Sequence, residues 1–199
     1  MELFTLKKYA RIEQKIKKSK FIASAFPVAT EDEAKTRIME IKREFHDARH
    51  SPYAYIVDNG KREKYSDEGE PSQSSGPPIL NHLKGNNIVN AIIIVTRYFG
   101  GIKLGIGGLV RAYGSSAKLV IESAGIIPFV LYANVRIVYN YNHTSYVMHI
   151  IDKFDAEIMK NEYSNVGIIT VKIKEDKLSS FVNEMKNPTM PDIEVLILE

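Results

Sequence analysis

The fold of this chain is decided between residues 91 and 125, where the sequence is AIIIVTRYFGGIKLGIGGLVRAYGSSAKLVIESAG. The apolar run from Ile88 to Val95 predicts a central strand that is covered on both faces. Apolar residues then recur at helical spacing, at Leu109, Tyr113, Ala117, Val120 and Ala124. Gly125 and Pro128 are typical of a helix end. The stretch therefore predicts a strand, a turn and a helix in succession.

Glycines dominate the turn between that strand and that helix, at Gly100, Gly101, Gly105, Gly107 and Gly108. Glycine lets backbone amides crowd around a ligand, and a helix N-terminus carries a partial positive charge. Lys103 and Arg111 add two cations. The turn is neither a Walker A loop, which needs Gly-Lys-Ser/Thr, nor a dinucleotide fingerprint, because Val110 stands where the third glycine belongs. We predict an anion-binding turn; the alternative is that the glycines only permit tight packing of strand against helix.

Upstream of this stretch, the sequence predicts a hairpin, two helices and a further strand. Lys20 to Val28 is expected to be a strand that pairs with the segment before it. A capping box, Thr-Glu-Asp-Glu at residues 30–33, is expected to open a helix. Pro52 to Val57 predicts a short strand, and Ile79 to Leu83 a short helix that ends at Gly85.

Residues 128–199 have an order of their own. Strands are expected at residues 133–139, 156–163, 168–173 and 193–197, with a helix after the first and another after the third. This βαββαβ order is the ferredoxin-like arrangement. We therefore predict an α+β protein of two domains, an N-terminal α/β sandwich over residues 1–127 and a ferredoxin-like domain over residues 128–199.

The composition excludes several classes of function. An apolar content of 44% and a charged content of 26% are ordinary for a soluble globular protein. Because the chain has no cysteine, it has no disulfide framework, no thiolate metal site and no cysteine nucleophile. There is no apolar run long enough to span a membrane and no apolar segment typical of a secretory signal. We expect a cytoplasmic protein without contact to a membrane.

The net charge of +3 conceals an asymmetry. Residues 1–128 hold 20 Lys and Arg against 14 Asp and Glu, which gives +6. Residues 129–199 hold 7 against 10, which gives −3. The basic excess therefore belongs to the part with the glycine turn. A basic face attracts polyanions such as RNA, or an acidic protein. The alternative is a solvated surface whose lysines protect a strand edge.

The polar loop at residues 66–78 is long for a compact domain, which indicates a functional or mobile segment. Asp67, Glu68 and Glu70 are oxygen ligands of the kind that Mg²⁺ prefers, but their spacing matches no calcium loop. Asp67 or Glu70 could also act as a general base. An acidic turn is more often simply solvated, so we expect no metal site and no cofactor.

Histidines and serines give weaker signals. His46 and His50 are four residues apart, but Pro52 disfavours helix just before it, so we expect the two rings to diverge. His50 remains as a single candidate site residue just before a strand. Ser72 and the serines after it lack the Gly-x-Ser-x-Gly frame of a serine hydrolase.

Four blocks of the sequence together resemble the YigZ/IMPACT family. They are Lys20-Phe21-Ile22, Ala48-Arg49-His50-x-x-Tyr53-Ala54-Tyr55, Ser66-Asp67-Glu68-Gly69-Glu70-Pro71-Ser72, and the stretch from Arg97 to Tyr113 that contains the glycine turn. The resemblance extends from about residue 18 to about residue 125. The chain resembles the bacterial two-domain members, without the RWD interaction domain that animal and fungal relatives carry.

The resemblance implies a fold and a field of function. It relates the first domain to one shared by a small-subunit ribosomal protein and elongation factor G, and the second to a ferredoxin-like domain of that factor. The animal and fungal relatives regulate translation, and no established enzyme activity attaches to the bacterial branch. The chain departs from the family at Gln73-Ser74-Ser75, where Gly-Thr-Ala is common, and at Ile106, where a small residue is common.

We therefore predict a translation-associated binding or regulatory protein whose first domain contacts RNA phosphate, the ribosome or an acidic partner. The candidate anion-binding residues are Lys20, His50, Asp67, Glu70, Ser72, Arg97, Gly100, Gly101, Lys103, Gly105, Gly107, Gly108 and Arg111. One alternative is an enzyme that binds a small phosphorylated metabolite at the same turn. Another is a regulator of translation that docks a protein partner on its ferredoxin-like sheet. No catalytic residue is assigned.

Overall fold

The computed structural model describes residues 2–186 and 191–198, and the chain divides into two compact units, Met1–Phe129 and Val130–Glu199. The expected boundary at residues 127–128 falls inside strand β7 (Ile126–Phe129), which pairs with β1 (Leu3–Leu6). Since this pairing ties β7 to the first unit, the division comes just after the strand. No helix within the described ranges is long and apolar enough to cross a membrane.

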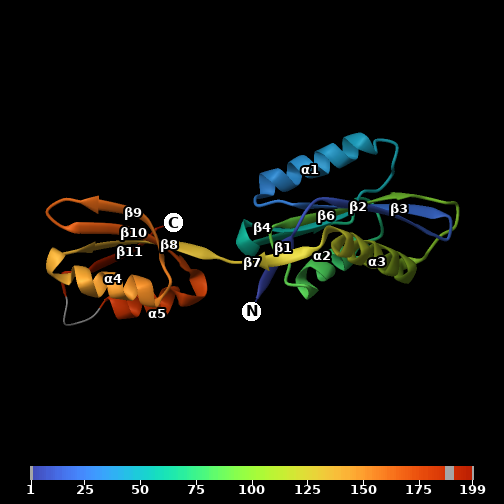
Figure 1. Ribbon diagram of the computed structural model, residues 1–199. Helices are drawn as coiled ribbons and strands as arrows, with labels where there is room; N and C mark the ends of the chain where they lie inside the picture. The colour runs from blue at the N-terminus through green and yellow to red at the C-terminus, as the bar shows by residue number, and fades with distance from the viewer. Residues whose placement is uncertain (1, 187–190, 199) are drawn as a thin grey trace. The chain divides into compact units, whose positions relative to one another are not determined.

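The first unit is built on an antiparallel sheet with the strand order β2-β3-β6-β4-β5. Its strands are β2 (Ala10–Ile16), β3 (Ser19–Pro27), β4 (Tyr53–Val57), β5 (Arg62–Ser66) and β6 (Ala91–Tyr98). Helix α1 (Glu31–Glu44) covers one face, and α2 (Gly76–Gly85) and α3 (Ile106–Ala124) cover the other (Figure 1). This three-layer arrangement is the α/β sandwich predicted for the first domain.

The central strand β6 is buried on both sides, as the apolar run predicted. Successive side chains of a strand point to opposite faces. Ile93 and Val95 accordingly pack in the core beneath α2 and α3, while Ile92 and Ile94 pack beneath α1. Arg97 follows in the same alternation as Val95, so its side chain enters the α2–α3 side of the sheet. This position places a charge inside the molecule.

The capping box forms with one change. Thr30 Oγ1 accepts from the Glu33 amide at 3.3 Å, but the Glu33 carboxylate accepts from the Ala29 amide at 2.7 Å, one residue before the position expected. Three strands were not predicted: β1, β5 and β7. β5 is an exposed edge strand with charged residues, so it has none of the apolar alternation on which the prediction relied.

The second unit has the element order predicted for it. Its elements are β8 (Tyr132–Tyr139), α4 (Thr144–Lys153), β9 (Glu157–Tyr163), β10 (Gly167–Lys174), α5 (Glu175–Met185) and β11 (Glu194–Leu198). The antiparallel sheet has the order β11-β8-β10-β9, and both helices pack on one of its faces (Figure 1). This is the ferredoxin-like arrangement. The relation of either unit to a domain of elongation factor G stays a prediction.

Candidate functional site

A pocket of about 460 Å³ in the first unit brings together residues from three parts of the chain. We call it the turn pocket. Its lining includes five of the predicted site residues: His50, Glu70, Arg97, Lys103 and Gly105. His50 precedes β4, Glu70 belongs to the loop before α2, and Arg97 lies near the end of β6. Lys103 and Gly105 come from the glycine turn. The antiparallel sheet and the start of α3 therefore assemble the site from segments that are distant in sequence.

A buried ion pair forms one wall of the turn pocket. Arg97 Nη1 donates to Glu70 Oε1 at 2.7 Å, and the two side chains are only 8% and 3% exposed. The Tyr113 hydroxyl donates to the same carboxylate oxygen at 2.7 Å. Burial, and then the adjacent Glu70 charge, raise the pKa of Tyr113 far above its usual range, so the hydroxyl remains a donor. Two hydrogen-bond donors, Arg97 and Tyr113, therefore hold the Glu70 carboxylate inside the protein.

The Arg97 guanidinium is not fully satisfied by this network. Arg97 Nη2 reaches Ser19 Oγ at 3.4 Å, but Nε is a buried nitrogen without a hydrogen-bond partner among the described residues. An unpaired buried donor costs about 1–3 kcal/mol. Proteins tolerate such costs mainly at functional sites. The ring centroids of Phe21 and Phe99 lie 5.6 Å and 5.5 Å from the guanidinium carbon, within the range of cation–π contacts.

His50 presents one ring nitrogen for chemistry. Its Nδ1 lies 2.9 Å from the carbonyl oxygen of Glu68. Because a carbonyl oxygen can only accept, Nδ1 must carry the proton and donate. The other nitrogen, Nε2, has no partner among the described residues, and the ring lines the turn pocket. The neutral imidazole therefore offers an acceptor there, and the protonated form would offer a second donor.

Asp67 has a structural role in the loop. Its carboxylate accepts from the amides of Gln73, Ser75 and Gly76 at 2.8–2.9 Å and from the Ser75 hydroxyl at 2.7 Å. Burial alone would raise the pKa of Asp67, but these hydrogen bonds outweigh it and hold the pKa below its usual value. The carboxylate thus ties residues 66–78 to the N-terminus of α2. Because its oxygens already accept these hydrogen bonds, Asp67 is poorly placed to bind a metal ion or to act as a general base.

The other acidic side chain of the loop is also engaged. Glu68 Oε2 lies 2.6 Å from the Lys42 ammonium of α1. Within the described parts of the chain, no three His, Asp or Glu side chains gather in a way that could hold a metal ion.

The glycine turn needs glycine for different reasons at different positions. A Cβ atom on Gly100 would lie 1.9 Å from the carbonyl oxygen of Lys18, so only glycine lets the turn pass over the β2–β3 hairpin. Gly105 precedes α3 with φ 72°, a left-handed conformation that favours glycine. The remaining glycines of the predicted set, Gly101, Gly107 and Gly108, lie in the turn and in the first turn of α3.

The N-terminus of α3 has no side-chain cap. The amides of the first helical turn have no acceptor within the helix, and they carry the positive end of its dipole. Gly105 and Ile106 line the turn pocket, which places this helix end at its edge. Lys103 is exposed beside it. The arrangement has the chemistry of an anion site.

Lys20 and Ser72 are among the predicted residues that do not line the turn pocket. Lys20 pairs in register with Tyr98, and its ammonium lies 5.1 Å from that ring and 3.7 Å from Glu13. Because Phe21 packs beneath α3, Lys20 points to the opposite face of the sheet. Ser72 is exposed in the loop and does not line the pocket.

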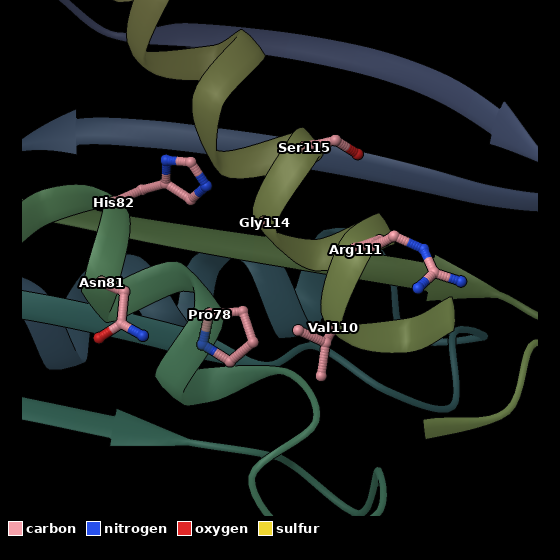
Figure 2. Close-up of a pocket in the computed structure, with 7 residues that line it drawn as sticks. All are labelled: Pro78, Asn81, His82, Val110, Arg111, Gly114 and Ser115. Carbon is pink, nitrogen blue, oxygen red and sulfur yellow. The ribbon is translucent and has the colours of Figure 1, made fainter. Parts of the chain in front are cut away.

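Arg111 also lies apart from Lys103. It lines a second pocket between α2 and α3, where Figure 2 shows its side chain next to Val110 and Gly114. The two cations that were predicted as one site therefore belong to two pockets.

Sequence reasoning missed several residues that form the turn pocket or its wall. Arg49 and Phe99 line it, and Tyr113 and Ser19 hydrogen-bond to its buried pair. Tyr113 was predicted only as a core residue. The sequence did offer a signal for this hydrogen bond, because the hydroxyl of a buried tyrosine usually has a polar partner.

Comparisons with known proteins match the sequence and the fold of this chain. The family described as Impact N-terminal domain matches residues 17–121, which contain the turn pocket. The IMPACT family member YvyE of Bacillus subtilis is 38% identical over 161 residues, covering 80% of this chain and 71% of that protein. The IMPACT family member YigZ of Escherichia coli is 26% identical over 191 residues, covering 94% of each. A crystal structure of a hypothetical protein, with 24% identity, shares the fold with a TM-score of 0.68 over 100% of this chain and 98% of that one.

Proposed function

This chain belongs to the IMPACT family, and we propose that it is a translation-associated protein that binds RNA phosphate in the turn pocket. The observation that carries the proposal is the presence of several hydrogen-bond donors in the lining of that pocket. Lys103, Arg49 and the uncapped N-terminus of α3 lie there. The carboxylate of the pocket, Glu70, is already neutralised by Arg97. A phosphate would thus meet positive charge without an exposed opposing carboxylate in the lining.

An exposed aromatic ring favours RNA over a bare anion. Phe99 is 56% exposed at the rim of the turn pocket. Unpaired bases stack on such rings with about 1–3 kcal/mol per base. A phosphate at Lys103 and a base on Phe99 would account for both features. The charge of the first unit supports this, because its 20 Lys and Arg exceed its 14 Asp and Glu by 6.

The proposal has consequences for location and partners. A protein that acts on RNA in translation would work in the cytoplasm, with ribosomes or structured RNA as its partners. Its binding would weaken as salt rises, because phosphate contacts release counterions.

The test is binding to purified ribosomes and to structured RNA across a salt series. Lys103→Ala should weaken binding to all RNA sequences alike and reduce the slope of log affinity against log salt by about one. Arg43→Ala is the matched control, since it removes one charge from an exposed position of α1 on the other face of the sheet. Equal affinity of wild type and Lys103→Ala would contradict the proposal. Partner binding that persists at high salt would favour an acidic or other protein partner instead.

A second candidate is an enzyme acting on a small phosphorylated metabolite. Two observations favour it: the Nε2 atom of His50 is available at the pocket, and a volume of about 460 Å³ is within the range of small-molecule sites. With a phosphate held at the glycine turn, His50 would serve as the general acid or base. A substrate screen with wild type and His50→Gln tests this. Turnover that His50→Gln leaves intact would remove the role of His50.

A further inference from the structure

A second pocket, of about 520 Å³, lies between α2 and α3. We call it the α2–α3 groove. Its lining comes from both helices, and Figure 2 shows Pro78, Asn81 and His82 on α2 and Val110, Arg111, Gly114 and Ser115 on α3. It shares no lining residue with the turn pocket. None of its residues takes part in the buried network of Glu70, Arg97 and Tyr113, so the groove is separate from the wall of the turn pocket.

The groove combines an apolar floor with a cationic, polar rim. Figure 2 shows the Val110 side chain directed toward the Pro78 ring, and the Arg111 guanidinium extending outward. No carboxylate lines the groove. Among the ion pairs of the described residues, Arg111 has no partner. The cation is thus available to a ligand from outside the chain.

Polar groups for recognising a base lie on the α2 side. Gly114 lets the His82 ring come close to α3, since a Cβ atom there would lie 3.3 Å from His82 Nε2. Burial, and secondarily the charge of Lys118, lower the pKa of His82. The imidazole is therefore neutral near pH 7 and can both donate and accept, like the amide of Asn81.

The groove and the turn pocket both lie next to the N-terminal part of α3. Ile106 lines the turn pocket and Val110 lines the groove. These residues are four apart, so they lie on the same side of the helix about 6 Å from each other along its axis. They are 63% and 38% exposed. A short apolar ridge therefore joins the two openings, with Lys103 at one end and Arg111 at the other.

We propose that the α2–α3 groove holds a further nucleotide of a single RNA strand whose neighbouring phosphate occupies the turn pocket. The base packs on Pro78 and Val110, and Arg111 pairs with the phosphate that follows. The occupant is single-stranded, because bases paired within an A-form duplex cannot be placed in such a groove. This inference rests on the proposed function and adds to it the strand type and the path of the strand.

The experiment measures affinity for oligouridylates of increasing length and for an RNA duplex of the same length, by fluorescence anisotropy with the full chain. Wild-type affinity should rise once the strand is long enough to reach the groove, and the duplex should bind more weakly. Arg111→Ala should remove that rise, because it deletes one charged contact to phosphate. We expect its affinity for the longer strands to be about tenfold lower than that of wild type. Val110→Ser should remove part of it by weakening the floor. Arg43→Ala, with the same loss of charge, should keep the rise.

The outcomes separate this inference from the function on which it rests. If Lys103→Ala loses affinity for every length while Arg111→Ala and Val110→Ser match the wild type, the groove has no role and only this inference fails. Equal affinity for the duplex and the single strand also overturns it. If wild type binds no oligouridylate and no ribosome at low salt, the proposed function itself fails. Since Arg111 and Val110 are exposed, unchanged thermal unfolding of both variants verifies that the fold is intact.

Discussion

The buried network of Glu70, Arg97 and Tyr113 and the glycine turn at residues 100–108 adjoin the same pocket but use their polar groups in opposite ways. In the network, one carboxylate oxygen receives two donors and is closed to solvent. In the turn, Lys103 is exposed and the first amides of α3 have no side-chain acceptor. The difference indicates that the first region builds the site and the second meets the ligand. Charge alone does not distinguish the two roles; burial and the presence of partners do.

The largest expected effect comes from breaking the buried ion pair. Glu70→Ala should lower the free energy of unfolding by about 3–5 kcal/mol, because it leaves the Arg97 charge buried without its partner. Urea unfolding of the full chain measures this. Glu68→Ala is the matched control, since Glu68 pairs with Lys42 at the surface and should cost no more than about 1 kcal/mol.

A double substitution sharpens that prediction. Glu70→Leu combined with Arg97→Met removes both charges and should recover much of the stability lost in Glu70→Ala. If Glu70→Ala lowered the free energy of unfolding no more than Glu68→Ala, the buried network would not be what stabilises the wall of the turn pocket.

The second effect tests the turn at its tightest point. Gly100→Ala should cost about 1–3 kcal/mol of unfolding free energy, because the added methyl would meet the Lys18 backbone at 1.9 Å. Gly107→Ala is the control, since the nearest atom outside its own helix backbone is Arg111 Nη1 at 3.7 Å. Thermal unfolding compares the two variants. Similar melting temperatures would show that the close approach at Gly100 is not a constraint.

The third effect concerns Asp67, which supports the loop between the two regions. Asp67→Asn should cost about 1–2 kcal/mol near pH 7 through the loss of a charged cap. The pKa of Asp67 is lower in the folded state than in the unfolded chain, so its contribution is present above the unfolded value and is lost as the pH falls through the folded value. The stability difference between wild type and Asp67→Asn should therefore shrink below about pH 4. Urea unfolding at a series of pH values checks this, and a difference independent of pH would contradict it.

The smallest effect on stability is expected at Lys103. Lys103→Ala should change the unfolding free energy by less than about 0.5 kcal/mol, because the side chain is exposed. The same variant should nevertheless lose affinity for RNA. A stability loss as large as that of Glu70→Ala would mean that the turn, too, is part of the structural network.

The sequence predicted the sheet, the helices and the ferredoxin-like unit because their apolar residues recur at regular periods. It missed β1, β5 and β7, which are short strands without a clear period. The role of Asp67 as a cap depends on the path of its own loop, and no spacing rule gives that path. The separation of Arg111 from Lys103 depends on how α3 packs against α2. Lys20 was wrongly predicted in the same site, because strand alternation places its side chain on the face of β3 opposite to Phe21.

The most direct test of the division between a structural network and a ligand-binding turn is an NMR titration of the full chain with a single-stranded oligouridylate. We expect the amide signals of Ile106, Gly107 and Gly108 to shift with the added RNA, while signals on α1 and in the second unit stay unchanged. Lys103→Ala should abolish these shifts and leave the rest of the spectrum as in wild type. Shifts that are absent from the first turn of α3, or that occur only on α1, would contradict the account.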